Sequence, residues 1–185
     1  QPASVAHGEA NLAAERPDAL LVEPLGYDPE SRDYPLIVFL HSYAGGAVEQ
    51  AWYLHLLQLQ ASTQDFLLLL PSGAVDAAGN TFWEATDTCC DHDAVQPGDA
   101  DWLAGQIDRG VSEHPVSRVG LFGASNGGFM AHAMACQHAD RVDAVASFAG
   151  MTFEDATLCA PSQPVSMLHI HGTSDDVVFF DGLHD

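Results

Sequence analysis

The sequence predicts an α/β domain with a mostly parallel sheet and helices on both faces. Several short runs are apolar at every position, which is typical of strands that helices cover on both sides. Segments with apolar residues at helical spacing lie between these runs, and such alternation is typical of a parallel sheet. The chain has 185 residues, of which 47% are hydrophobic, so it can form a domain with a substantial core.

Six strands are predicted, the first of them short. It covers residues 19–22 and follows a polar, alanine-rich arm over residues 1–18. The other strands are expected at residues 36–40, 66–70, 118–122, 142–148 and 165–170, and helices at 48–60, 99–114 and 129–138. Residues 74–97 have no clear period and are expected to be irregular. Residues 19–185 are therefore interpreted as a single domain.

A sharp turn is expected where the strand over residues 118–122 ends. The chain there reads Gly123-Ala124-Ser125-Asn126-Gly127, which is Gly-x-Ser-x-Gly, and a helical pattern follows. Strand, turn and helix are the context in which this pentapeptide holds a nucleophilic serine. Side chains at the two glycines would collide with the strand and the helix. The alternative is a glycine-rich loop that merely joins the two elements.

A serine becomes a useful nucleophile only with a base, an acid that orients the base, and donors for the oxyanion. The backbone N–H of Asn126, directly after Ser125, is one expected donor. The second is expected from Tyr43, in the glycine-rich loop after the strand at residues 36–40. Asp175 follows the strand at residues 165–170 and is the candidate acid, with a turn or helix-cap aspartate as the alternative.

The base departs from the expected pattern, in which the order along the chain is Ser, Asp, His. Only His184 follows Asp175. Either His184 folds back to serve as the base, or the base lies beyond residue 185 and the chain is a fragment without its last strand and helix. His41, His169 and His171 lie at or beside strand ends and are expected to hold loops through hydrogen bonds.

The charge is strongly acidic. Twenty-six acidic residues against five basic ones give a formal charge of −21, which argues against nucleic-acid or anionic-membrane partners. The apolar runs are too short to span a bilayer. No His-Glu-x-x-His spacing occurs, so a metal-dependent hydrolase is disfavoured and no cofactor is expected. The chain begins at Gln1, as a mature secreted or periplasmic protein or a trimmed one would. The sequence indicates no oligomeric state.

Four cysteines occur, at Cys89, Cys90, Cys136 and Cys159. Adjacent cysteines can bond to each other only with strain. Bridges from Cys89 or Cys90 to Cys136 or Cys159 are therefore expected in a secreted protein, with the connectivity open. The alternative is a set of buried free thiols.

Five segments, taken in order, form a more specific pattern. They are residues 35–46 (PLIVFLHSYAGG), 82–90 (FWEATDTCC), 118–128 (RVGLFGASNGG), 135–136 (AC) and 169–178 (HIHGTSDDVV). This pattern resembles the polyhydroxybutyrate depolymerase-like and feruloyl esterase-like branch of the α/β-hydrolases. The resemblance covers the chain from about residue 19 onward.

The resemblance implies a secreted serine esterase with an α/β-hydrolase fold that acts on polyesters or on feruloyl or acetyl esters. It implies Ser125 as nucleophile, Asp175 as acid, and Tyr43 and Asn126 as oxyanion donors. Two departures are visible. Ser42 stands where the family has glycine, and the family's catalytic histidine lies well past the aspartate motif.

Ester hydrolysis through an acyl-enzyme is the function that these residues favour, with a small or polymeric ester as the substrate. Trp83 is a candidate to stack on an aromatic or polymeric substrate, and the alternative is a tryptophan of the core or of a loop anchor. The competing interpretation of the whole chain is a non-catalytic binding protein, or an inactive fragment, on a hydrolase scaffold.

Overall fold

A computed structural model describes residues 16–182 of the chain. Most of the arm predicted at residues 1–18 lies outside this range. The elements are β1 (Leu20–Val22), β2 (Tyr34–Leu40), α1 (Ala47–Tyr53), α2 (Leu56–Thr63), β3 (Leu67–Leu70), β4 (Ala74–Val75), β5 (Thr81–Phe82), α3 (Asp99–Glu113), β6 (Val116–Ala124), α4 (Asn126–Gln137), β7 (Ala144–Phe148) and β8 (Ser166–Ile170). Two short 3₁₀ turns cover Ala139–Arg141 and Ala156–Leu158.

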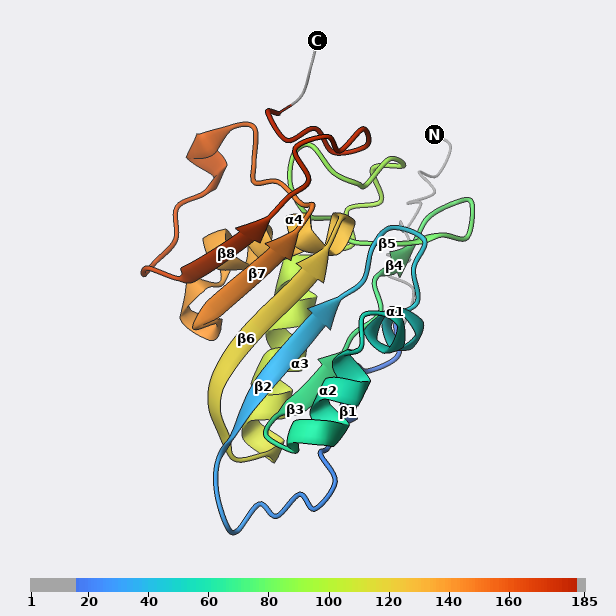
Figure 1. The fold of residues 1–185 in the computed structure, drawn as a ribbon. Coiled ribbons are helices and arrows are strands. Elements are labelled where there is room, and N and C mark those ends of the chain that lie inside the picture. Colours follow the sequence, from blue (N-terminus) through green and yellow to red (C-terminus); the bar gives the residue numbers. More distant parts are fainter. Residues whose placement is uncertain (1–15, 183–185) are drawn as a thin grey trace, which may run out of the picture.

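The main sheet has six strands in the order β1-β3-β2-β6-β7-β8. Strand β1 runs antiparallel to β3, and the other neighbouring pairs are parallel, as the sequence predicts. The carboxyl ends of the parallel strands therefore meet at one edge of the sheet, at the top of Figure 1. A small β4–β5 hairpin lies beside the main sheet, within residues 74–97, so the expectation that this stretch is irregular is wrong there. Strands of two residues are too short to show a period in the sequence.

Helices cover both faces of the sheet (Figure 1). Helices α3 and α4 pack on one face, where Leu36, Val38 and Leu40 of β2 join the larger core. Helices α1 and α2 pack on the other face of β2 and β3, where Phe39 belongs to a second, smaller core. Alternate residues of β2 thus enter two different cores, which explains why this strand shows no polar alternation.

The helix expected over residues 48–60 is two helices. Helix α1 ends at Tyr53, and α2 begins only after His55, whose φ of 62° is left-handed. The prediction of one continuous helix is therefore wrong at this point. The apolar spacing continues across the break, so the break is not visible in the hydrophobic pattern, and Trp52 and Leu59 remain exposed.

Strand β8 forms one edge of the main sheet, and its residues are exposed from Ser166 to Ile170. Leu168 and Ile170 are 57% and 46% exposed, so apolar surface is accessible along this edge. Within the described part of the chain, no helix has both the length and the apolar character needed to cross a membrane.

The cysteines pair differently from the sequence-based expectation. Cys89 bonds to Cys90, and Cys136 bonds to Cys159. The expectation of bridges between these two pairs is wrong because of helix geometry. Cys89 contacts Asn126 at the start of α4, whereas Cys136 is ten residues further along that helix, about 15 Å away at 1.5 Å per residue.

Candidate active site

The turn between β6 and α4 holds Ser125 in an unusual backbone conformation. Its φ and ψ are 51° and −120°, which correspond to the first central residue of a type II′ turn, a position dominated by glycine. The Ser125 N–H donates to the carbonyl of Phe148, at 2.8 Å, and its own carbonyl accepts from Phe129, at 3.0 Å. The main chain on both sides of Ser125 is thereby fixed to β7 and to α4.

The two glycines of the pentapeptide are required by close backbone packing. A Cβ on Gly123 would overlap the carbonyl of Gly127, and a Cβ on Gly127 would overlap the carbonyl of Leu40 at the end of β2. Both contacts are with main-chain atoms, which a rotamer change cannot relieve. Side chains at both glycines would therefore collide with their surroundings, as the sequence predicts.

The backbone N–H groups of Tyr43 and Asn126 have no hydrogen-bond partner among the described residues. In the loop after β2, Ser42 donates to the Gln50 side chain at 2.8 Å, and Ala44 donates to the carbonyl of Thr81 at 2.8 Å. Among residues 16–182, no hydrogen bond uses the N–H of Tyr43, which lies between them, or that of Asn126. These are the two N–H groups that the sequence predicts as oxyanion donors.

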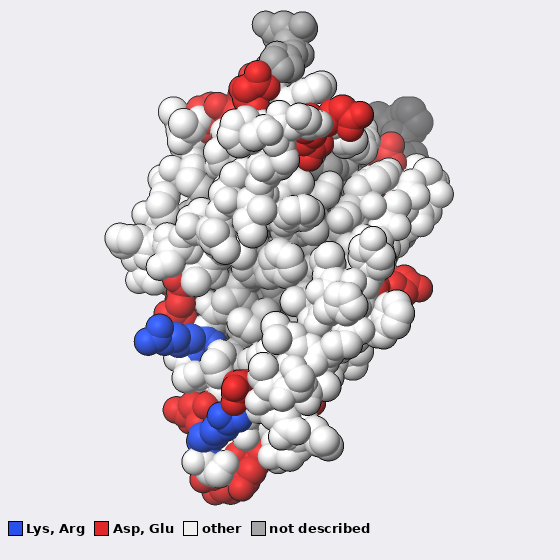
Figure 2. Space-filling model, in the orientation of Figure 1, with Lys and Arg blue, Asp and Glu red and all other residues white. Residues whose placement is uncertain are grey.

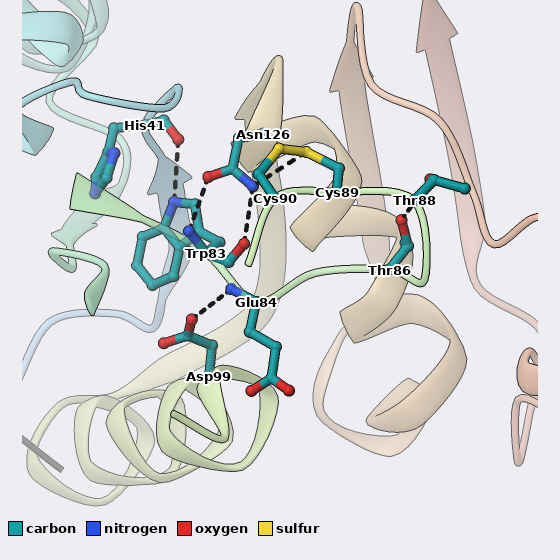
Figure 3. The surroundings of a disulfide bond; sticks show 9 residues. All are labelled: His41, Trp83, Glu84, Thr86, Thr88, Cys89, Cys90, Asp99 and Asn126. Carbon is teal, nitrogen blue, oxygen red and sulfur yellow. Dashed lines mark hydrogen bonds between the residues drawn. A yellow bond between two sulfur atoms is a disulfide. The ribbon is translucent and has the colours of Figure 1, made fainter. Parts of the chain in front are cut away.

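The side chain of Asn126 is buried and tied to the main chain of Trp83 (Figure 3). Its Oδ1 accepts from the Trp83 N–H at 2.8 Å, and its Nδ2 donates to the Trp83 carbonyl at 2.9 Å. The sequence suggested only the backbone of Asn126 as functional. Its carboxamide could not be assigned, because the partner is 43 positions away along the chain.

Trp83 is fully buried and cannot stack on a substrate. Its indole Nε1–H donates to the carbonyl of His41 at 3.0 Å, and its ring packs against the His41 imidazole. The substrate-binding interpretation of Trp83 is therefore wrong, and the alternative of a loop-anchoring tryptophan is correct. Figure 3 shows Trp83 between His41 and Asn126. His41 directly follows β2, and Asn126 is the first residue of α4, just after β6.

His41 holds the start of the loop that contains Tyr43. Its Nε2 accepts from the Gly73 N–H at 2.9 Å, and its Nδ1 lies 2.8 Å from the Ser42 carbonyl. These partners require a neutral ring with the proton on Nδ1. Burial lowers the pKa of His41 and favours this neutral form. The expectation that His41 holds a loop is confirmed.

Asp175 lies in the turn after β8 and accepts two backbone hydrogen bonds, from Val177 and Val178, each at 3.0 Å. These donors lower the pKa of Asp175, so its carboxylate stays ionised. The His171 imidazole lies close to this carboxylate, with its Nε2 at 3.6 Å from Asp175 Oδ2. His171 also lies 2.7 Å from the Val178 carbonyl, so it holds the same turn.

The predicted triad is not assembled within the described residues. His184 lies outside them, and among them no hydrogen bond joins the Ser125 hydroxyl to a side chain. Ser125, Tyr43 and Asn126 are brought together, whereas Asp175 is at the end of β8, two strands from β6. The roles of Asp175 and His184 remain predictions.

A cluster of three histidines, which the sequence did not reveal, lies between α4 and the end of β8. The ring centroid of His132 is 5.7 Å from that of His169, which is 5.3 Å from that of His171. His132 Nε2 is buried without a hydrogen-bond partner among the described residues. Burial, reinforced by His169, lowers the pKa of His132 to about 4.

Acid is therefore expected to destabilise the fold through His132. His132 titrates near pH 6.5 in the unfolded chain and near pH 4 in the folded chain. Between these values the unfolded state therefore binds more protons at His132 than the folded state does. As far as it depends on His132, the free energy of unfolding is highest above pH 6.5 and falls as the pH falls towards 4. The loss at pH 5 is at most about 2 kcal/mol. Urea unfolding at pH 7 and pH 5 measures this change in the free energy of unfolding. His132→Leu should lose less stability over this interval, and an equal loss would contradict the assignment.

Ser125 opens into a cavity of about 560 Å³. Tyr43 and both cysteines of the Cys89–Cys90 disulfide also line it, and much of the remaining wall is apolar. The apolar lining residues are Phe129, Met151, Phe153, Val177, Val178 and Phe179. A cavity of this size with a few polar groups is typical of a small-molecule site.

The cavity lies in an acidic part of the molecule. Glu154 and Asp181 are among its lining residues, and no arginine or lysine of the described chain joins them. Figure 2 shows carboxylates on the upper part of the visible face, where Figure 1 places the loops that follow the parallel strands, and basic side chains only lower down. The surroundings of Ser125 therefore disfavour an anionic ligand.

No protein-family model matches the chain. Among curated proteins, it is 29% identical over 157 residues to NocK of Nocardia uniformis subsp. tsuyamanensis, named as an esterase; the match covers 84% of this chain and 43% of NocK. It is 31% identical over 147 residues to a bifunctional acetylxylan esterase/xylanase, XynS20E of Neocallimastix patriciarum, over 78% of this chain and 20% of that protein. The chain thus spans less than half the length of either relative.

Solved structures resemble the chain in fold. Esterase PE8 has a TM-score of 0.67 at 20% identity, over 89% of this chain and 79% of that one. An acetyl xylan esterase from Aspergillus awamori has a TM-score of 0.68 at 16% identity, over 88% and 69%. At these identities the likeness shows a shared backbone architecture.

Proposed function

We propose that this chain, which has the α/β-hydrolase fold expected from its sequence, acts as a serine esterase with Ser125 as the nucleophile. The observation that carries the proposal is a strained Ser125 at a cavity that Tyr43 also lines, together with the N–H groups of Tyr43 and Asn126, which have no hydrogen-bond partner among the described residues. The two esterase relatives support the same conclusion.

In the proposed reaction the Ser125 Oγ attacks the ester carbonyl, and the Tyr43 and Asn126 N–H groups stabilise the oxyanion that forms. A histidine base takes the Ser125 proton and passes it to the leaving alcohol. Water then attacks the acyl-enzyme and releases the acid. Asp175, kept ionised by its two backbone donors, is the proposed partner of that histidine. His184 is the candidate base within this chain.

We further propose an uncharged carboxylic ester as the substrate, either a polyester or a feruloyl or acetyl ester. The apolar wall of the cavity suits a hydrocarbon or aromatic group, and the carboxylates around it disfavour anionic esters. A secreted or periplasmic location fits the two disulfides and the acidic composition.

A fluorophosphonate probe tests the proposal directly. We expect the probe to label the folded chain once, at the peptide that contains Ser125, and not the urea-unfolded chain. Hydrolysis of p-nitrophenyl acetate should accompany labelling. If hydrolysis is lost in His184→Ala, the base is His184.

Absence of labelling and of hydrolysis, both in this chain and in a longer form that extends past residue 185, would contradict the esterase proposal. That result would favour a non-catalytic binding protein.

A further inference from the structure

We propose that the Cys89–Cys90 disulfide positions the oxyanion hole, with Cys89 and the Asn126 carboxamide as positioning residues for the reaction at Ser125. The inference rests on the proposed esterase function. It follows from a continuous set of contacts that begins at the disulfide and passes through Asn126, Trp83 and His41 (Figure 3) to the loop that contains Tyr43.

The first contact joins Cys89 to Asn126. The Asn126 Nδ2 donates to Cys89 Sγ at 3.5 Å, in addition to its bond to the Trp83 carbonyl. The carboxamide therefore has three partners in a fully buried position. Because the side chain is held at three points, the Asn126 main chain, which carries the first oxyanion donor, has little freedom to rotate.

The disulfide fixes the place of the Cys89 sulfur. The Cys89 N–H donates to the Thr86 carbonyl at 3.2 Å, and the Cys89 carbonyl accepts from Thr86 at 3.0 Å, so residues 86–89 form a closed turn. The bond to Cys90 prevents rotation about the Cα–Cβ bond of Cys89. A free Cys89 thiol would be able to turn away from Asn126 into the cavity that both cysteines line.

The contacts continue from Asn126 to the second donor. The Asn126 carboxamide is hydrogen-bonded to the main chain of Trp83, and the Trp83 indole N–H donates to the His41 carbonyl at 3.0 Å. Two positions earlier, Thr81 accepts from the Ala44 N–H at 2.8 Å and donates through Oγ1 to the Gly45 carbonyl at 2.7 Å. Residues 81–83 therefore bind both sides of Tyr43, so one short segment connects the two oxyanion donors.

Loss of the Cys89 sulfur is expected to lower kcat more than it changes KM. Oxyanion donors act on charge that develops in the transition state, and substrate binding in the ground state depends little on them. Small misplacements of such groups can cost up to about 10²-fold in rate. For Cys89→Ala we expect kcat to fall about 10- to 100-fold, with KM within about twofold of the wild type.

Three variants separate the possible causes, with p-nitrophenyl acetate as substrate. Cys90→Ala breaks the disulfide but keeps the Cys89 sulfur, so its kcat should lie between those of the wild type and Cys89→Ala. The double variant Cys136→Ala/Cys159→Ala removes the other disulfide, which is remote from Asn126, and should keep the wild-type kcat below its melting temperature. An equal fall in kcat in this double variant would overturn the proposal.

A readout that does not depend on activity completes the test. In ¹H–¹⁵N spectra, Cys89→Ala should shift the Trp83 indole N–H, the Asn126 carboxamide and the main-chain amides of Tyr43 and Asn126. The exchange of the Trp83 indole proton with solvent should also accelerate. The double variant of Cys136 and Cys159 should leave these resonances in place.

Unchanged resonances in Cys89→Ala, or alkylation of Cys89 and Cys90 without prior reduction, would overturn the positioning role. If the wild type hydrolyses no ester, the esterase proposal fails by itself, and the spectra still decide whether Cys89 positions Asn126.

Discussion

Replacing Ser125 by alanine is expected to lower ester hydrolysis by about 10⁴-fold or more, because the hydroxyl that attacks the carbonyl is gone. Stability should change by less than about 0.5 kcal/mol, since alanine keeps the same backbone preference and the Ser125 side chain makes no capping hydrogen bond. Replacing Ser125 by glycine is expected to cause the same loss of activity and to raise the free energy of unfolding by about 1 kcal/mol.

The gain expected for glycine comes from the backbone. A non-glycine residue at a φ of 51° and ψ of −120° costs about 1–3 kcal/mol, and glycine removes this cost. Part of the gain is offset because glycine loses about 0.5–1 kcal/mol more conformational freedom on folding. Initial rates with p-nitrophenyl acetate and urea unfolding of the three proteins measure both effects.

Ser112→Ala is the matched control, because Ser112 is an exposed serine in the last turn of α3, before the start of β6, whereas Ser125 follows the end of that strand. It should keep full activity. Hydrolysis that survives in Ser125→Ala would place the nucleophile elsewhere. A glycine variant no more stable than the alanine variant would show that the turn is not strained.

The turn around Ser125 was predictable because its constraints are local. Gly123 and Gly127 are needed for contacts that involve the turn itself and the end of β2, and the strand and helix beside it have clear patterns. The free N–H of Tyr43 was likewise predictable from its place after a central strand. In both cases a few consecutive residues and the direction of a parallel strand determine the geometry.

The parts of the site that the sequence did not predict depend on contacts between distant segments. Trp83 and Asn126 are 43 positions apart, and nothing near Trp83 distinguishes a buried anchor from a substrate platform. The cysteine pairing depends on where each cysteine lies relative to α4. In the sequence, His132 looks like an ordinary helical residue, because its neighbour His169 comes from β8, a distant segment. Burial and long-range pairing determine the role of Trp83, the cysteine pairing and the surroundings of His132, and local sequence patterns do not encode either.

Replacing Gly127 by alanine is expected to lower the free energy of unfolding by about 3–5 kcal/mol, because the new Cβ would overlap main-chain atoms of Leu40 and His41. The cost is that large because β2 is paired with both β3 and β6 and cannot easily move. For a chain of this size, such a loss corresponds to a fall in melting temperature of about 10 °C.

Gly105→Ala provides the comparison, since both substitutions add one methyl group to a helical glycine. Gly105 lies in α3 with no atom within 4 Å of the added Cβ, so alanine should stabilise the protein by about 0.5–1 kcal/mol through helix propensity. Thermal and urea unfolding followed by circular dichroism measure both variants. Equal stability of Gly127→Ala and Gly105→Ala would contradict the close contact between the start of α4 and the end of β2. It would also contradict the placement of Ser125 beside Tyr43.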